Sequence, residues 1–265
     1  MADRRNLEAK EKRTLEAPER RQAVGRAALS IVPDFQYQLD DVLFENLLKA
    51  TLGPDPETCR RAIVQAISDG AQPEELADFY IPALARRMGD QWCVDALSFA
   101  GVTIGVSRLQ AMLRSLGPNW SGDKGSLTDA PSVLLVVPQE IYHTLGAIVL
   151  SGQLRRKGFS VKLVLGGRPK DVVDLLNRAK FNAVFISSSQ GQTLESLHRL
   201  IVAVRSAAKD VPPVVIGGSI LEIETANDVT ALTGADHATK NLDEAVRLCG
   251  LRVASQRIAQ AEHRT

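Results

Sequence analysis

The hydrophobic positions of this chain follow two different periods along its length. Between residues 18 and 116 the apolar side chains recur every three or four positions, as Phe44, Leu47 and Leu48 do, and this spacing is typical of amphipathic helices. From residue 132 onward, short apolar runs alternate with helical segments. The change of period predicts two domains, a bundle of four or five helices over 18–116 and an α/β domain over 132–252.

Proline and acidic residues indicate where several helices of the bundle begin. Asp55 or Pro56 is expected to start one helix, and Pro73 lies near the start of another. A last long helix is predicted over 94–116, with Trp92 at its start. An aromatic side chain in that position can cover the face of a planar cofactor, although such a tryptophan more often belongs to the core.

The second domain contains five strand–helix units with short connections. This pattern predicts a doubly wound, five-stranded parallel sheet of the Rossmann or flavodoxin-like kind, with helices on both faces. The expected strands cover 132–137, 160–165, 182–187, 212–216 and 235–238. The expected helices cover 143–157, 170–179, 192–208, 220–230 and 241–249.

Segments of low hydrophobicity flank and separate the two domains. Residues 1–17 carry dense charge of both signs, which favours a flexible arm. Residues 117–131 are rich in Gly, Ser, Asp and Pro and are interpreted as a linker. Residues 253–265 are interpreted as a polar tail.

Composition narrows the range of functions. The formal net charge is +1, so no large basic field favours direct binding to nucleic acid. The 3 cysteines contain no CxxC pair, which argues against a disulfide framework and against a zinc site. No segment approaches about 18 continuous apolar residues, and the charged N-terminus does not resemble a signal peptide. We therefore expect a reduced cytoplasmic protein without a membrane span.

The strongest candidate for a functional site follows the first predicted strand. His143 lies three residues before Gly146, on the loop after the apolar run 133–137, and such loops are where open α/β sheets bind ligands. A neutral imidazole is a good ligand for cobalt or iron, and a glycine lets a bulky group pass close to the helix start. The alternative is a surface histidine beside a glycine that packs the helix.

Two further loops are expected at the same edge of the sheet. Ser187, Ser188 and Ser189 follow the third strand, where their hydroxyls can bind a buried polar group or cap the helix that begins near Thr193. The pair 217–218 is Gly-Gly after the fourth strand, where it can let a ligand lie on the backbone or form a tight turn.

Together, the HxxG loop, the serine loop and the Gly-Gly turn resemble the cobalamin-binding domain of the methionine synthase type. The resemblance implies that His143 binds cobalt as the lower axial ligand, in place of the cofactor's own benzimidazole, with Thr144 and Gly146 beside it. The preceding bundle resembles the cap over the upper face of the cofactor, and Trp92 matches the tryptophan of that cap. The displaced nucleotide tail would then lie in a slot formed by Ser187, Ser189, Gly217 and Gly218. On this basis a valine at Gly218 should fill the slot and weaken binding without unfolding the domain.

Two segments of the bundle, 89–95 and 99–110, narrow the resemblance to the PpaA/AerR group of photosynthetic bacteria. Proteins of that group are cobalamin-binding, light-related regulators that oppose the PpsR/CrtJ repressor of photosystem and pigment genes. The resemblance implies hydroxo-, methyl- or adenosylcobalamin as cofactor and a PpsR/CrtJ-type repressor as partner. It implies that the protein acts as an antirepressor. Neither enzymatic activity nor direct DNA binding is expected.

The chain departs from the family pattern in ways that keep alternatives open. Ile141 stands where the DxHxxG motif has its aspartate, so the carboxylate that would raise the basicity of the ligand is missing. Val102 and Thr103 stand where related light sensors carry a Glu-His pair, and no histidine precedes His143. The weakened motif leaves room for a haem-binding sensor, a corrinoid methyl carrier, or a scaffold that acts only through protein contacts. The missing carboxylate counts against the methyl carrier.

Overall fold

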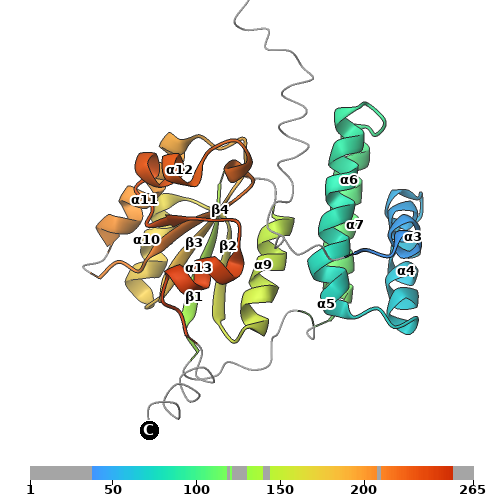
Figure 1. Cartoon of the computed structure of the whole chain (residues 1–265), viewed down its shortest axis with the longest axis horizontal. Helices are drawn as coiled ribbons and strands as arrows, with labels where there is room; N and C mark the ends of the chain where they lie inside the picture. The colour runs from blue at the N-terminus through green and yellow to red at the C-terminus, as the bar shows by residue number, and fades with distance from the viewer. Residues whose placement is uncertain (1–37, 118–119, 121–129, 140–143, 208–209, 253–265) are drawn as a thin grey trace, which may run out of the picture.

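The computed structural model describes residues 38–117, 120, 130–139, 144–207 and 210–252 of the chain. The predicted arm, most of the predicted linker and the polar tail lie outside these residues, and so does His143. The described part consists of a helical bundle and an α/β unit that lie side by side (Figure 1). The fold predicted from the change of hydrophobic period is therefore confirmed.

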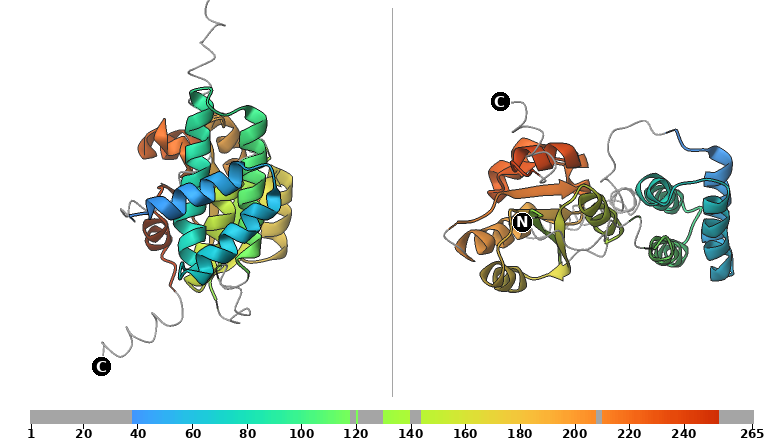
Figure 2. Two further views of the ribbon diagram at one scale, coloured as in Figure 1. Left: turned by 90° about the vertical axis from the view of Figure 1, so that its right-hand side faces the viewer. Right: turned by 90° about the horizontal axis from the view of Figure 1, so that it is seen from below.

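The bundle contains helices at the positions where apolar residues recur every three or four places. Its elements are α3 (Asp41–Leu52), α4 (Pro56–Ser68), α5 (Pro73–Glu75), η1 (Leu76–Tyr80), α6 (Ile81–Cys93) and α7 (Phe99–Ser115). As predicted, α4 begins at Pro56, and the carboxylate of Asp55 caps it by accepting the Glu57 N–H over 3.0 Å. Figure 2 shows α3 and α4 crossing the outer side of α6 and α7, which lie nearer the sheet.

One continuous helix runs from Pro73 to Cys93 and contains a turn of π-helix, η1. Pro82 lies in its interior, where proline has no N–H to donate and its ring crowds the carbonyl of Asp78, four residues earlier. The wider π turn immediately before Pro82 accommodates this conflict without ending the helix. The hydrophobic spacing alone does not distinguish this turn from ordinary α-helix.

The turn between α6 and α7 corrects the prediction for the last helix. That helix begins at Phe99 rather than at residue 94, because the hydroxyl of Ser98 caps it by accepting the Gly101 N–H over 3.1 Å. Asp95 in the turn adopts a positive φ of 56°, which is incompatible with α-helix. Trp92 therefore belongs to the last turn of α6, not to the start of α7.

The α/β unit is built on a five-stranded parallel sheet, as predicted. Its strands are β1 (Ser132–Pro138), β2 (Ser160–Gly167), β3 (Ala183–Ser188), β4 (Val214–Gly218) and β5 (His237–Ala238). Their order is β2-β1-β3-β4-β5, and all neighbours are parallel. In this flavodoxin-like order the direction of winding reverses between β1 and β3, and ligands bind beyond the carboxyl ends of the strands at that point.

Helices cover both faces of the sheet. On one face lie α9 (Leu145–Arg156) and α13 (Leu242–Leu248); on the other lie α10 (Pro169–Arg178), α11 (Leu194–Ala207) and α12 (Ala226–Thr233). With cover on both faces β1 is almost entirely buried, which explains its unbroken apolar run. No helix within the described residues has the length and apolar character needed to cross a membrane.

The helix predicted over 220–230 is wrong in its detail. The chain first forms a 3₁₀ turn, η2 (Ser219–Glu222), directly after β4. Helix α12 begins only after Thr225, whose hydroxyl accepts the Asp228 N–H over 3.1 Å. A threonine at the N-cap fixes the helix start more firmly than the apolar spacing on either side of it.

Helix α9 belongs to two cores at once. Leu145 and Val149 pack into the core of the bundle, whereas Ala147, Leu150 and Leu154 pack on the sheet. Figure 2 shows α9 between the two units when the molecule is seen from below. The bundle is therefore joined to the sheet through the helix that follows the predicted ligand loop.

Further contacts hold the bundle to the C-terminal half of α9. The guanidinium of Arg156 pairs with the carboxylate of Asp78 in η1 and donates to the carbonyl oxygen of Trp120. Burial raises the pKa of Asp78, although the hydrogen bond and charge of Arg156 lower it. Trp120, which falls in the predicted linker, is 6% exposed and packs its ring against Gly152.

We expect Gly152→Leu to lower the free energy of unfolding by about 1–3 kcal/mol, because the new side chain overlaps the Trp120 ring. A Cβ at Gly152 would lie 2.5 Å from ring atom Cζ3 of Trp120. Denaturation in urea measures the loss, and the matched background is Trp120→Ala, in which the obstacle is gone. A loss of the same size in both backgrounds would show that Trp120 does not fill the space beside Gly152.

Candidate functional site

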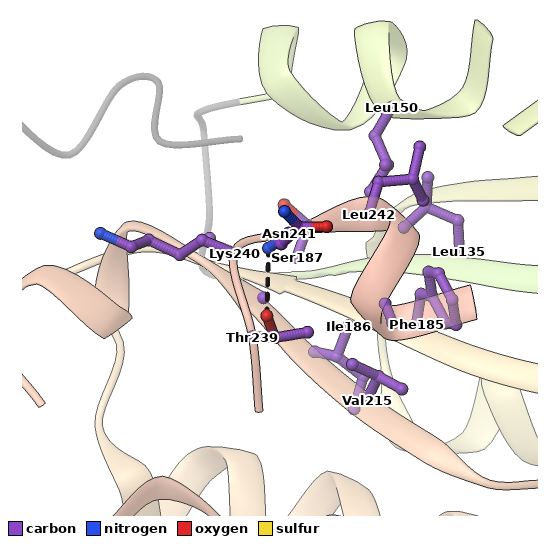
Figure 3. A pocket seen from close by; sticks show the side chains of 13 residues that line it. Leu135, Leu150, Phe185, Ile186, Ser187, Val215, Thr239, Lys240, Asn241 and Leu242 are labelled. Atoms are coloured by element: carbon purple, nitrogen blue, oxygen red, sulfur yellow. Dashed lines mark hydrogen bonds between the residues drawn. The ribbon is translucent and has the colours of Figure 1, made fainter. Parts of the chain in front are cut away.

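A groove opens near the carboxyl ends of the strands, between α9 and α13 (Figure 3). The space it encloses is about 30 Å³, far below the ~300–1,000 Å³ typical of ligand pockets, so a bulky ligand enters only if the side chains that line the groove move apart. We call it the α9–α13 groove, and its lining residues are Leu135, Leu150, Phe185, Ile186, Ser187, Val215, Gly217, Gly218, Thr239, Lys240, Asn241, Leu242 and Ala245.

The register of the sheet brings the serine loop and the Gly-Gly turn together in this groove. Ser187 pairs with Gly217, and Ser188 pairs with Gly218, across β3 and β4. Because side chains alternate along a strand, Ser187 faces the groove while Ser188 faces the opposite side. There the Ser188 hydroxyl donates to the Gln192 side-chain oxygen over 2.8 Å. Three predicted site residues, Ser187, Gly217 and Gly218, thus line one groove.

Ser189 lies just beyond the end of β3 and is buried, but it does not line the α9–α13 groove. The alternative role considered for the serines was to cap the next helix, α11, but another residue caps it. The hydroxyl of Thr193 accepts the Ser196 N–H over 3.2 Å at the start of α11. Ser187 therefore lines the groove and does not cap α11.

Gly218 meets a backbone requirement that excludes other residues. Its φ of 106° and ψ of −173° lie in a region populated essentially by glycine alone. A Cβ there would also overlap the carbonyl oxygen of Ser188 on the neighbouring strand. This corrects the expectation for Gly218→Val: the valine would disrupt the β3–β4 pair instead of leaving the domain folded. Gly217 is less constrained, although a Cβ would lie 3.0 Å from the Thr239 carbonyl oxygen.

The mouth of the groove is formed by the segment between β5 and α13, which the sequence patterns did not single out. Thr239 Oγ1 accepts the Asn241 N–H over 3.1 Å and donates to the carboxylate of Glu244. The Asn241 side-chain oxygen in turn accepts the Glu244 N–H over 2.9 Å. Figure 3 shows Lys240 extending away from the apolar side chains of the groove. The two-residue strand before this segment was too short to indicate where it would lie.

A polar contact also links the loops after β3 and β4 to one another. The Gln190 amide donates to a carboxylate oxygen of Glu222 in η2 over 2.7 Å. Arg86 of α6 lies in the field of the same carboxylate: burial lowers the pKa of its guanidinium, and Glu222 and Asp90 raise it.

The loop after β1 is tied to the bundle at its last residue. Thr144 stands in the N-cap position of α9, but instead of capping the helix its hydroxyl accepts a hydrogen bond from the Gln110 amide of α7 over 3.1 Å. Gly146 follows, half-buried in the first turn of α9. His143, the predicted metal ligand, lies outside the described residues, so its role stays a prediction. No sequence pattern had indicated that Gln110 contacts Thr144, the residue next to His143.

Trp92 is not part of the α9–α13 groove. Its ring lies against Phe99, with centroids 6.0 Å apart and planes inclined by 56°. From Asp78, which pairs with Arg156, the helix rises about 21 Å to Trp92. Followed backward along the chain from Arg156, α9 rises about 18 Å toward the same end of the molecule, to Thr144 (Figure 1). Trp92 therefore lies near the level of Thr144, at the same end of the molecule as the groove.

The described residues offer no alternative metal centre. No group of three or more His, Cys, Asp or Glu side chains among them is arranged to bind a metal ion. Burial raises the pKa of the Cys249 thiol to about 11 and also raises that of Cys59. Both thiols stay protonated at neutral pH and are poor metal ligands and nucleophiles.

Comparison with known proteins identifies the α/β unit. The B12 binding domain family matches residues 131–248, which include the whole sheet and the groove. An uncharacterized 20.5 kDa protein of Rhodobacter capsulatus, from the bchF–crtJ intergenic region, is 36% identical over 169 residues. That match covers 64% of this chain and 87% of the relative.

Two solved structures match most of this chain. The monomethylamine corrinoid protein of Methanosarcina barkeri superposes with a TM-score of 0.61 at 14% identity, covering 79% of this chain and 98% of its own. A novel cobalamin-binding protein from Desulfitobacterium hafniense matches with a TM-score of 0.41 at 18% identity, covering 78% and 97% of the two chains. The first of these likenesses shows a common fold.

Proposed function

Because this chain belongs to the PpaA/AerR group of B12-binding-domain proteins, we propose that it is a cobalamin-binding, light-responsive regulator that acts by binding a PpsR/CrtJ-type repressor. The observation that carries the proposal is the α9–α13 groove, in which Ser187, Gly217 and Gly218 come together at the carboxyl edge of the sheet. Those are the residues from which the family resemblance builds the slot for the nucleotide tail of cobalamin.

The chemistry of the groove suits that tail. Gly217 and Gly218 keep one wall free of side chains, and the strand pairing leaves no room for a Cβ at Gly218. The interior is apolar and the mouth polar, which matches a flat base joined to a phosphate-bearing chain. Haem has no such tail, so the groove favours cobalamin over the haem-binding alternative.

Under this proposal His143 would hold cobalt, and Thr144 and Gly146, at the start of α9, would lie beside the corrin. Bound cobalamin would supply a cobalt centre whose bond to a ligand is sensitive to light. Trp92 stands at the matching level of the bundle to cover the upper face. Gln110 holds Thr144, so the bundle contacts the residue next to the proposed ligand directly.

Helix α9 offers a route from the cofactor to a protein-binding surface. Leu145 and Val149 of α9 are part of the bundle core, and Arg156 pairs with Asp78. A displacement at the start of α9 would therefore change the packing of the bundle, because packed interfaces shift between discrete arrangements rather than deforming smoothly. The cofactor needs only to interact differently with the two arrangements to change their populations.

The proposed partner follows from genomic context and charge. The Rhodobacter capsulatus relative comes from the region between bchF and crtJ, and a CrtJ-type repressor is the partner that the family resemblance implies. A formal net charge of +1 gives no basic field for DNA, so we propose contact with the repressor protein and no catalytic activity. Ile141 in place of the motif aspartate argues against a methyl carrier, which uses that carboxylate to modulate cobalt.

Calorimetric titration of the purified full-length protein with a PpsR/CrtJ-type repressor tests the regulatory role. We expect the protein loaded with hydroxo-, methyl- or adenosylcobalamin to bind the repressor, with at least one form changing its affinity on illumination by about 5-fold or more, the lower end of typical allosteric couplings. The cofactor-free protein serves as the control. Equal affinity with and without cobalamin, in the dark and in light, would eliminate the sensor function.

A further inference from the structure

We infer that Gln110 of α7 is a positioning residue for the proposed cobalt ligand. It holds Thr144 in a backbone conformation that local helix capping would not choose, and so lets the bundle set how the chain enters α9 from His143. The inference rests on the proposed function and adds to it the contact through which the bundle acts on the ligand. It follows from a comparison of Thr144 with the residues that begin other helices of this chain.

Side chains cap several helices of this chain in the same way. Helices α3, α4, α7, α12 and α13 each begin after a residue whose side-chain oxygen accepts a backbone N–H of the first turn. The backbone of each capping residue is extended; ψ is 158° at Ser98 and 152° at Thr225. This is the usual N-cap arrangement, in which the chain changes direction as it enters the helix. The capping residues are Asp40, Asp55, Ser98, Thr225 and Asn241.

Thr144 departs from this arrangement, although threonine is a favourable capping residue. Its backbone is helical, with φ of −92° and ψ of −15°, and its side chain makes no capping hydrogen bond to α9. Its hydroxyl instead accepts a hydrogen bond from the side-chain amide of Gln110 over 3.1 Å. A contact between the bundle and α9 therefore replaces the local cap at the start of this helix.

The packing around Gln110 explains how this contact competes with the local cap. Leu109 and Leu113, on the same helix as Gln110, are buried in one core together with Leu145 and Val149 of α9. Because that core already orders both helices, the hydrogen bond between them adds little further loss of conformational entropy. The bond is also partly buried, which limits competition from water. A bundle in its present place thus favours the helical conformation of Thr144.

The conformation of Thr144 determines the direction in which the chain joins α9. Without Gln110, the Thr144 hydroxyl would be free to accept the Ala147 N–H, as Thr225 accepts the corresponding N–H of α12. The ψ angle of Thr144 would then turn from −15° to near the 152° of Thr225 and redirect the preceding residue, His143. A metal ligand has to be held within about 0.5 Å of its productive position, so this rotation would weaken or abolish coordination.

The coupling between bundle and ligand acts in both directions. If the position of the bundle determines how His143 meets cobalt, a change of coordination changes the preferred position of the bundle by the same free energy. The hydrogen bond between Gln110 and Thr144 joins α7 directly to the residue next to the proposed ligand. It therefore gives the proposed signal a route from cobalt to the bundle.

Nuclear magnetic resonance of the full-length protein without cofactor tests the conformational part of the inference. In Gln110→Leu, which removes the amide at similar size, the α- and β-carbon chemical shifts of Thr144 should move from helical toward extended values. Exchange of the Ala147 amide hydrogen should slow by about 5-fold, because it gains a capping partner. Gln110→Glu keeps an oxygen that can accept from the Thr144 hydroxyl and should retain the wild-type shifts. Gln65→Leu, where the amide bonds only to Asp69 of the outer side of the bundle, is the matched control.

Absorbance titration of the same variants with hydroxocobalamin tests the positioning role. We expect Gln110→Leu to move the spectrum of the bound corrinoid toward that of His143→Ala and to weaken binding by about 10-fold or more, as for other residues that orient a metal ligand. Gln110→Glu and Gln65→Leu should match the wild type. Thr144 shifts that Gln110→Leu leaves unchanged, or a wild-type corrinoid spectrum despite changed shifts, would overturn the inference. A wild-type protein that binds no corrinoid would refute the proposed function and, with it, the role of Gln110.

Discussion

Gly218→Ala should reduce the free energy of unfolding by about 3 kcal/mol or more, which makes it one of the most damaging single changes available in the α/β unit. Two costs add together. The backbone at Gly218, with φ of 106° and ψ of −173°, is in a region that other residues avoid at a cost of about 1–3 kcal/mol. In addition, the new Cβ overlaps the Ser188 carbonyl oxygen, so the β3–β4 pair must separate where it borders the groove.

Gly234→Ala separates these two costs. Gly234 ends α12 with φ of 81°, and a Cβ there would lie 3.9 Å from its nearest neighbour, Ile201 Cγ2. That change should therefore show only the left-handed backbone cost of about 1–2 kcal/mol. Urea denaturation of both variants against the wild type measures the difference. Equal losses would mean that contact with Ser188 does not constrain position 218.

His143→Ala is expected to abolish axial coordination of cobalt by the protein, so that the visible spectrum of the bound corrinoid moves toward that of free cofactor. Loss of a metal ligand removes a coordinate bond, and the effect on affinity should exceed the roughly 10–100-fold cost of losing a residue that only orients a ligand. The chain has 4 histidines, and the other three, His198, His237 and His263, lie at least 55 residues further along the sequence.

His198→Ala is the control for this substitution. His198 lies on α11, with its Nδ1 3.1 Å from the carbonyl oxygen of Thr233, and so it holds two helices together on the opposite face of the sheet. Its removal should leave the corrinoid spectrum unchanged. If the two variants gave the same spectrum as the wild type, the lower ligand would have to be sought elsewhere.

Much of the fold is visible in the hydrophobic pattern because burial on both faces of a parallel sheet leaves little choice of residue. The run Val133–Val137 predicts β1 for this reason, and the serine and Gly-Gly segments lie at the carboxyl ends of β3 and β4, where they form the last residues of the strands. Helix starts are predictable where a side chain caps the first turn, as the Asp55 carboxylate does for α4. Where apolar spacing continues through a turn, as it does through 94–98, the prediction extends the helix too far.

The site is less predictable because several of its parts depend on long-range packing. The groove mouth at Thr239–Asn241 follows a strand of two residues, too short to show a period. The contact of Gln110 with Thr144 joins positions 34 residues apart, and each is an ordinary polar residue on its own helix. Trp120 falls in a segment whose Gly and Ser content indicates a linker, yet its ring is buried against Gly152.

Cobalamin binding at the carboxyl edge of the sheet is tested most directly by the visible absorption spectrum of the full-length protein after incubation with hydroxocobalamin and removal of free cofactor by gel filtration. We expect the corrinoid to elute with the protein, near one per chain, with bands displaced from those of the free cofactor as an imidazole replaces its own base. A protein fraction without corrinoid absorbance would contradict cobalamin binding, and with it the regulatory role proposed for this chain.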